Sequence, residues 1–471
     1  MTFTLNQVLL RSVSPTGLGF ANMVEFVIGS VLFISREPVR LALQPLDPSA
    51  KNFYQTVINF SYLGLAVCGA LVVPVFYWQL DLSGLQLHPW EYQLGIGAVL
   101  ASVILELLSE PFYNLNQAQL NMAKRAKIES MASFVKCAVQ FFVVTRLAIG
   151  SSTDVTFVFG YVISQFCYSL TIFGCYSKFR LIWPTKTSEG IYLTTSTFNY
   201  LRSLFVQLVF KHFLTEGDKF VLNQLFPIFD QGYYSVVSNY GSLLARILFQ
   251  PIEESLRMNV SKQFALKLNT KSTMATLNNT IFKVATLYIY LLTLILIFAP
   301  VNSSYLVNLA FASFPDKHKL SQVFQIYWYY LPFLAVNGVT EALFNSIYTD
   351  SKHVSQYSRL MLVNSICFYA TSTYFIQYRD LGLVGLVVAN SINMGVRIIF
   401  CFVKLRSIID FKSQQWQKFV YFWTASIAVV AIQMSVIGHE TTTSLEFAKS
   451  FLLGLVLLVV IAVLERKNIL S

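Results

Sequence analysis

The sequence has few charged residues and no long polar stretch. Asp, Glu, Lys and Arg make up 12% of its 471 residues, whereas a soluble domain carries about 25%. Apolar runs of about 20 residues recur along the whole chain, and a helix of about 20 apolar residues spans the hydrocarbon core of a bilayer. A single large soluble core is therefore excluded. The composition predicts an all-α, polytopic membrane protein without a soluble domain.

Groups that commonly perform catalysis or hold cofactors are also scarce. The chain has five histidines, and only His212 falls inside a predicted span, where a hydrogen-bonded packing role is the more common one. No GxxxxGK[ST] loop is present, so the chain does not itself hydrolyse ATP. The six cysteines show neither a disulfide framework nor CxxC spacing, and we expect small buried side chains. We therefore expect no enzyme, no cofactor and no metal site.

The positive charge lies mainly in short loops between apolar runs. The net charge is +11, but no nucleic-acid signature accompanies it. Every second loop is rich in Lys and Arg, as in the stretches around Arg36, Lys124 and Lys352, and the loops between them carry few. Basic loops of membrane proteins stay in the cytoplasm. This alternation predicts that both ends of an intact chain are cytoplasmic.

The apolar runs predict thirteen complete spans. They cover residues 17–35, 54–77, 91–112, 131–149, 155–176, 202–227, 231–250, 281–309, 323–349, 360–377, 381–403, 418–438 and 445–463. The first ten residues, MTFTLNQVLL, form a truncated first span, since they reach only about 15 Å as a helix. They lack the basic start and apolar core of a cleavable signal peptide.

The two halves of the sequence resemble each other in order. The matching segments are FTLNQ at 3–7 with FVLNQ at 220–224, GF at 19–20 with GY at 232–233, VLFISREPVR at 31–40 with ILFQPIEESLR at 247–257, and EPFYN at 110–114 with EALFN at 341–345. Short apolar segments also match by chance, but the order holds over consecutive spans. Parallel repeats are a known construction of secondary transporters.

The repeat predicts two pseudo-symmetric six-helix bundles plus two C-terminal helices. The expected domains are an N-terminal bundle at 1–176, a cytoplasmic linker at 177–201, a second bundle at 202–403, and two additional spans with a short tail at 404–471. The match of Leu5 with Leu222 places Met1 beside Asp218, well inside a span of the second copy. We therefore expect that the first half of the first span lies upstream of this sequence.

Charged residues inside spans are the candidate functional residues, because each costs roughly 2.5–3.5 kcal/mol to insert. The densest group lies in KHFLTEGDKF at 211–220, which contains Lys211, Glu216, Asp218 and Lys219. Gly217 among these charges permits an unwound turn that lines water. The alternative is self-neutralising pairs, Lys211 with Glu216 or Asp218 with Lys219.

A second group lies at the cytoplasmic ends of two repeat-related spans. Its members are Arg36, Glu37 and Arg40 in the first copy and Arg246, Glu253, Glu254 and Arg257 in the second. Arginine suits phosphate because its planar fork donates two hydrogen bonds and stays charged. The alternative is ordinary anchoring to lipid head groups. Arg246 fits that alternative poorly, since it lies several residues inside its span.

A third group consists of carboxylates. Glu106 and Glu110 are four residues apart on one helix face, and Glu341 occupies the equivalent place in the second copy. Paired carboxylates can form a proton or cation site. They can also pair with the arginines of the second group, which is the interpretation we favour.

Four of these segments resemble the motifs of a known family. SREPVR at 35–40, ELLSEPFY at 106–113, KHFLTEGDKF at 211–220 and SNYGSLLARILFQPIEESLR at 238–257 are similar to motifs of the eukaryotic oligosaccharide-diphosphodolichol translocation proteins, the Rft family. This family belongs to the multidrug/oligosaccharidyl-lipid/polysaccharide exporter superfamily. The resemblance implies two six-helix bundles, with two extra spans in some members. Family members begin with a complete first span, and this sequence does not.

The resemblance also implies a function. It implies an endoplasmic-reticulum flippase that moves dolichyl diphosphate bearing five mannoses and two N-acetylglucosamines from the cytoplasmic to the lumenal leaflet for protein N-glycosylation. Its partners would be this glycolipid and membrane lipids, without nucleic acid. We expect Arg36, Arg40, Arg246 and Arg257 to receive the diphosphate, with Lys211 and Lys219 at a deeper or lumenal station. Two alternatives stay open: a non-transporting accessory protein of the same pathway, and a cation-coupled antiporter of the superfamily.

Overall fold

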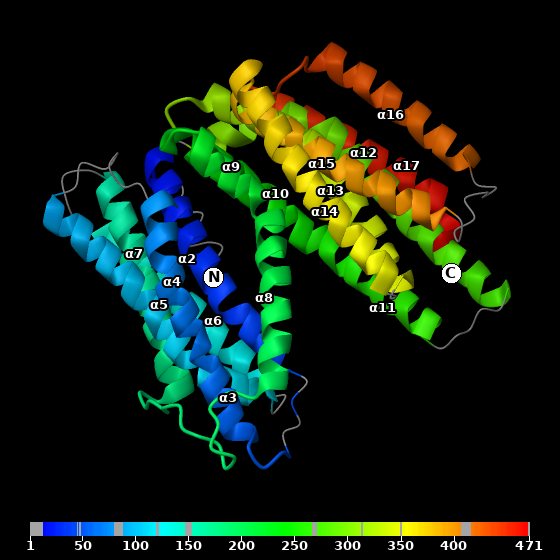
Figure 1. Cartoon of the computed structure of the whole chain (residues 1–471). Coiled ribbons are helices and arrows are strands. Elements are labelled where there is room, and N and C mark those ends of the chain that lie inside the picture. Colours follow the sequence, from blue (N-terminus) through cyan, green and yellow to red (C-terminus); the bar gives the residue numbers. More distant parts are fainter. Residues whose placement is uncertain are drawn as a thin grey trace. The chain divides into compact units, whose positions relative to one another are not determined.

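A computed structural model describes residues 13–44, 46, 49–79, 88–118, 122–146, 153–265, 271–311, 314–348, 351–406 and 416–469. Throughout these residues the regular structure is helical, without a strand (Figure 1). The expected all-α class is confirmed. The predicted truncated span at 1–10 lies outside the described residues.

The chain divides into two compact units, residues 1–232 and 233–471. The first unit contains α2 (Pro15–Leu43), α3 (Phe53–Ser61), α4 (Leu63–Gln79), α5 (Pro89–Ala118), α6 (Met122–Arg146), α7 (Thr153–Ser177), α8 (Thr195–Thr215), α9 (Gly217–Leu225) and the start of α10 (Ile228–Leu244). The second contains the rest of α10, the π-helix η1 (Ala245–Phe249), α11 (Gln250–Ala265), α12 (Lys271–Ala310), α13 (Lys317–Ile347), α14 (Ser351–Thr373), the π-helix η2 (Tyr374–Tyr378), α15 (Gly382–Leu405), α16 (Trp416–Val436) and α17 (Ser444–Ile469).

Each of the thirteen predicted spans overlaps one or more of these helices. Eight described helices are long and apolar enough to cross a membrane by length and composition. Between the predicted spans at 231–250 and 281–309, α11 covers residues up to 265 and α12 starts at residue 271, so both helices extend beyond the apolar runs. Charged side chains on a helix are compatible with water beyond the bilayer, so the end of the apolar run did not mark the end of the helix.

In the first unit α2 lies at the centre. It packs against α4, α7 and α8, and α7 packs in turn against α5 and α6. The most apolar stretch of α2 is 72% buried, whereas the corresponding stretch of α17 is 11% buried. This contrast separates a helix enclosed by protein from one that presents its sides to lipid. Because α8 packs on α2, residues 202–232 belong to the first unit. The predicted division into two six-helix bundles stays a prediction.

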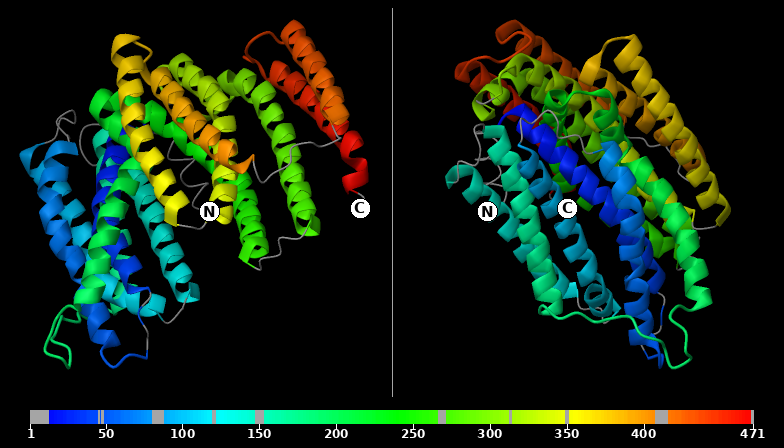
Figure 2. Two further views of the ribbon diagram at one scale, coloured as in Figure 1. Left: turned by 45° about the vertical axis from the view of Figure 1, so that its right-hand side comes forward. Right: turned by 60° about the vertical axis from the view of Figure 1, so that its left-hand side comes forward.

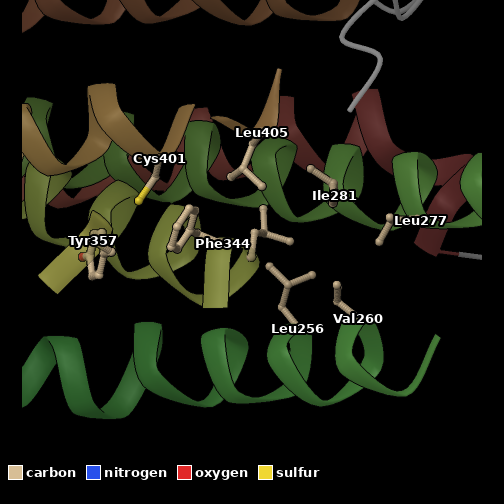
Figure 3. Packing of buried hydrophobic residues seen from close by; sticks show 9 residues of the cluster. Leu256, Val260, Leu277, Ile281, Phe344, Tyr357, Cys401 and Leu405 are labelled. Atoms are coloured by element: carbon tan, nitrogen blue, oxygen red, sulfur yellow. The ribbon is translucent and has the colours of Figure 1, made fainter. Parts of the chain in front are cut away.

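In the second unit α13 packs against α11, α12 and α15. A buried cluster joins these helices to α14, and Phe344 of α13 lies at its centre (Figure 3). The helices α16 and α17 lie side by side in each view (Figure 2), and their apolar side chains form a separate cluster with Tyr290 of α12. The two C-terminal helices therefore pack on α12 through their own core.

The six cysteines are all free thiols, so the expectation of no disulfide framework is confirmed. Cys68 and Cys401 are buried, as expected, and three others are half-buried. Cys367 of α14 is exposed, so the expectation of a buried side chain is wrong there. An exposed position on a lipid-facing helix accepts a small apolar group as readily as a core does.

Two glycines singled out by the repeat make a reciprocal contact. Gly19 of α2 lies against the carbonyl of Ile228, and Gly232 of α10 lies against the carbonyl of Pro15. Pro15 and Ile228 are separated by the same 213 residues as Gly19 and Gly232. Two copies related by a two-fold axis make such paired contacts. The geometry favours the internal repeat and explains why both helices carry glycine at this position.

We predict that Gly19→Ala and Gly232→Ala each destabilise the protein by about 1–3 kcal/mol, because the added methyl group would overlap a backbone carbonyl that cannot rotate away. Thermal unfolding of the purified protein would measure the effect. The matched control is Gly69→Ala in α4, where nothing lies within 4 Å and alanine favours the helix. Equal stability of all three variants would contradict the close crossing.

Candidate functional site

Arg40 and Glu110 form a buried, two-pronged ion pair between α2 and α5. Arg40 donates from Nε to one carboxylate oxygen at 2.8 Å and from Nη2 to the other at 2.5 Å. The Glu110 side chain is only 4% exposed, and the guanidinium stacks over the Tyr113 ring at 3.7 Å. Both the donors and the charge of Arg40 are therefore largely used within the protein. Glu37 adds a looser contact at 3.9 Å.

A second pair lies about one turn away on the same two helices. Arg36 donates to Glu106 at 2.9 Å, and the Glu106 side chain is 5% exposed. Gln165 and Ser169 of α7 also donate to Glu106, at 3.1 and 2.9 Å. The favoured expectation that these carboxylates pair with the arginines is confirmed for Glu106 and Glu110. The two amide and hydroxyl donors from α7 were not anticipated, since nothing in their spacing marks them.

In the second copy the corresponding carboxylate pairs with a different arginine. Glu341 of α13 pairs at 2.5 Å with Arg397 of α15, and no ion pair joins it to Arg246 or Arg257 in the described residues. Expecting Glu341 to pair with those two arginines is therefore wrong. The charge of Arg397 inside an apolar span was visible in the sequence, but nothing in the sequence indicated that Glu341 would be its partner.

The other two predicted carboxylates of the second copy, Glu253 and Glu254, also have their contacts within the second unit. Glu253 lies half-buried against Gly338 of α13, where any side chain larger than hydrogen would collide with its carboxylate. Glu254 is exposed and accepts from Gln250 at 2.9 Å. Neither carboxylate forms an ion pair within 4 Å of a described cation. The charged residues of the matching segments at 31–40 and 247–257 therefore have different partners in the two copies.

Arg246 lies on the π-helix η1, and its side chain is exposed. Within the described part of the chain it donates hydrogen bonds to Ser242 one turn earlier, at 3.2 Å to the carbonyl and 3.3 Å to the hydroxyl. Arg257 of α11 is exposed as well. Among the described residues neither arginine has a carboxylate within ion-pair distance, so each keeps donors available for an external anion. Wider π-turns within α-helices occur frequently at functional sites.

The segment KHFLTEGDKF contains a helix break, as expected from Gly217. α8 ends at Thr215, Glu216 adopts a non-helical turn, and α9 starts at Gly217. Lys219 pairs with Glu216 at 2.7 Å, which is neither of the expected pairings. Asp218 in the first turn of α9 accepts a hydrogen bond from the Lys219 backbone amide at 2.9 Å. Lys211 is exposed without an ion-pair partner in the described part of the chain.

Two further polar networks stabilise the first unit. His212 contacts Ser30 at 2.9 Å and stacks on Phe33 at 4.8 Å, so its expected packing role is confirmed. Lys136 of α6 donates to the Tyr161 hydroxyl at 3.3 Å, which donates to Glu25 of α2 at 3.2 Å. Glu25 and Lys136 are intramembrane charges whose link through tyrosine could not be read from the sequence.

The six predicted cations thus fall into two classes. Arg36, Arg40 and Lys219 have carboxylate partners, and Lys211, Arg246 and Arg257 have none among the described residues. No group of three metal-ligating side chains occurs in the described ranges. Lys211, Arg246 and Arg257 can each donate hydrogen bonds to an anion.

We predict that Arg40→Leu lowers the stability of the purified protein by about 3–5 kcal/mol, because it leaves the Glu110 carboxylate buried without a cation. The double variant Arg40→Leu/Glu110→Leu should recover most of the loss in thermal unfolding. Arg125→Leu is the control, since its pair with Glu129 is 40% and 41% exposed and should be worth under about 1 kcal/mol. A double variant no more stable than the single one would contradict this role.

The sequence profile described as Rft protein matches residues 1–471, the whole chain. The chain is 34% identical to the Man(5)GlcNAc(2)-PP-dolichol translocation protein RFT1 of Candida albicans, over 99% of this chain and 91% of the relative. It is 30% identical to the protein of the same name from Saccharomyces cerevisiae, over 100% of this chain and 92% of the relative.

Two solved structures share the fold. The lipid II flippase MurJ in an inward closed conformation aligns with a TM-score of 0.68 and 14% identity, over 99% of this chain and 96% of its own. An inward-facing multidrug resistance MATE family transporter of the MOP superfamily aligns with a TM-score of 0.62 and 12% identity, over 88% and 96%. These identities establish a shared fold alone. The chain is a polytopic α-helical membrane protein, and it belongs to the Rft family.

Proposed function

We propose that this protein is a flippase of the endoplasmic-reticulum membrane that moves the dolichyl-diphosphate heptasaccharide from the cytoplasmic to the lumenal leaflet for protein N-glycosylation. The observation that carries the proposal is near full-length similarity, at 34% and 30% identity, to relatives named as translocation proteins for this glycolipid. The fold shared with a lipid flippase is compatible with it.

The physical problem is the transfer of a diphosphate and seven sugars past hydrocarbon. A cation that is already paired with a buried carboxylate has little capacity left for a new anion, whereas an unpaired arginine can donate two hydrogen bonds to phosphate. Arg246 and Arg257 meet this requirement in the second unit. We therefore assign diphosphate contacts to these two residues and a structural role to Arg36 and Arg40. Lys211 of the first unit is exposed as well, and we assign it a separate contact with an anion as a point charge.

The direction of transport rests on orientation. Arg36, Arg40 and Arg257 belong to loops and helix ends in the basic set, which the loop-charge alternation places in the cytoplasm. A basic cytoplasmic entrance would attract the diphosphate in the leaflet where it is loaded. The dolichol tail would stay in lipid throughout.

The antiporter alternative loses its main support. It needs carboxylates that exchange protons or cations, and Glu106, Glu110 and Glu341 are each paired with an arginine. A carboxylate whose charge is already neutralised by a guanidinium within 3 Å is a weaker ligand for a passing cation. Transport measurements distinguish a flippase from the alternative of a non-transporting accessory protein.

We predict that vesicles containing the purified protein translocate labelled heptasaccharide lipid, and that Arg246→Ala reduces the rate at least tenfold, because the diphosphate loses a bidentate donor. The assay measures the glycolipid accessible to a lumenal glycosidase with time. Arg379→Ala, which removes an exposed cation outside the helices, is the matched control and should keep the wild-type rate.

Wild-type rates in Arg246→Ala would remove the site assignment while leaving the flippase role intact. A wild-type protein that binds the glycolipid without accelerating its movement would instead favour the accessory role.

We also predict that translocation is insensitive to imposed proton and sodium gradients, because Glu106, Glu110 and Glu341 are each paired with an arginine. Rates in vesicles with and without each gradient would agree within about twofold. Acceleration by either gradient that disappears in Glu341→Gln would support cation coupling after all.

A further inference from the structure

A pocket of about 420 Å³ opens among α12, α13, α16 and the turn that joins α16 to α17. Its volume lies within the range of small-molecule sites, about 300–1,000 Å³. All its lining residues belong to the second unit, and none of the predicted site residues lines it. Tyr329 and Met434 at its rim are 56% and 55% exposed, so the pocket can be reached from outside the protein.

Gln433 lines this pocket with an unpartnered amide. Its side chain belongs to a residue only 2% exposed, and neither the amide nitrogen nor the amide oxygen has a hydrogen-bond partner among the described residues. A buried amide without partners costs about 1–3 kcal/mol, and an apolar residue of similar size would avoid that cost. A pocket-lining residue whose donor and acceptor both lack partners therefore indicates a ligand that can accept one hydrogen bond and donate another.

Glu440 adds a fixed acceptor to the lining of the pocket. Ser304 donates to one of its oxygens at 2.5 Å and Gln325 to the other at 2.8 Å. These two hydrogen bonds lower the pKa of the Glu440 carboxyl, which keeps it ionised. Thr293 and His439 add further polar groups, and the ring of Tyr329 adds an apolar face.

The lining selects among classes of ligand. No Lys or Arg is among the described lining residues, and the Glu440 carboxylate repels anions, so phosphate is disfavoured. An acyl chain would leave both Gln433 atoms unsatisfied. An ammonium group only donates, so it would leave the Gln433 NH₂ without an acceptor. A hydroxyl both donates and accepts, and several hydroxyls on one ring would satisfy Gln433 and Glu440 together.

We propose that this pocket binds a neutral polyhydroxyl ring, with Gln433 as its central hydrogen-bonding residue and Glu440 as a second acceptor. The chemistry fits a sugar of a lipid-linked glycan, or the inositol ring of a phospholipid whose phosphate stays outside the pocket. The site is separate from the assigned diphosphate contacts, and its occupancy does not depend on transport.

The test uses the full-length protein in phosphatidylcholine nanodiscs, because maltoside detergents carry a competing sugar. One arm measures equilibrium binding of the released heptasaccharide of five mannoses and two N-acetylglucosamines. The other arm measures retention of phosphatidylinositol by native mass spectrometry. Wild-type protein should bind one of these probes, and Gln433→Leu should weaken that binding at least tenfold. The exposed Gln377→Leu is the matched control and should match wild type.

Glu440→Gln provides a second variant that keeps the shape of the side chain and should weaken binding severalfold. Binding of the heptasaccharide alone identifies a glycan as the source, and retention of phosphatidylinositol alone identifies a phospholipid. Loss of binding in Gln433→Leu with an unchanged translocation rate would support this site and leave the proposed function standing. Failure of both probes to bind, or binding in Gln433→Leu equal to wild type, would overturn the proposal.

Discussion

The structure depends on the neutralisation of charge inside the first unit. Arg36 with Glu106 and Arg40 with Glu110 form two pairs about one helical turn apart, and both join α2 to α5. The carboxylates are almost completely buried, so removing either cation would leave a charge that hydrocarbon cannot solvate. The pairs therefore fix the register of α2, the most enclosed of the eight candidate spans, against its neighbour.

This constraint separates two roles that arginine can play in one membrane protein. A guanidinium that donates both prongs to a buried carboxylate stabilises the helix pair and has little left for a passing phosphate. Arg246, held only by Ser242 on a π-helix, carries its charge without such a partner among the described residues. In the first copy of the repeat the arginines stabilise the packing of two helices, whereas in the second copy Arg246 and Arg257 stay available for an anion. The related sequences differ in this way because the neighbouring helices offer different partners.

Much of the fold could be predicted from the sequence. Apolar runs located a helix at each predicted span, and Gly217 located the break between α8 and α9. The paired glycines at 19 and 232 were visible as part of the repeat, although their reciprocal contact was not. Helix ends beyond the bilayer were missed, because charged residues end an apolar run without ending a helix. The predicted domain boundaries stay predictions.

The candidate site was less predictable, because partner choice is a property of tertiary packing. Sequence spacing placed Glu106 and Glu110 on one face, and the pairing with arginine followed from the cost of buried charge. The sequence could not show that Glu341 would pair with Arg397, since that contact joins α13 to α15. Gln433 gave no signal in the sequence, because one amide in an apolar run usually bonds to a neighbouring helix.

The most direct measurement is an electron cryo-microscopy structure of the full-length protein with the heptasaccharide lipid bound. We expect diphosphate density within hydrogen-bond distance of Arg246 or Arg257, with the Arg36–Glu106 and Arg40–Glu110 pairs intact. Diphosphate density on Arg36 or Arg40, with their carboxylates released, would contradict it.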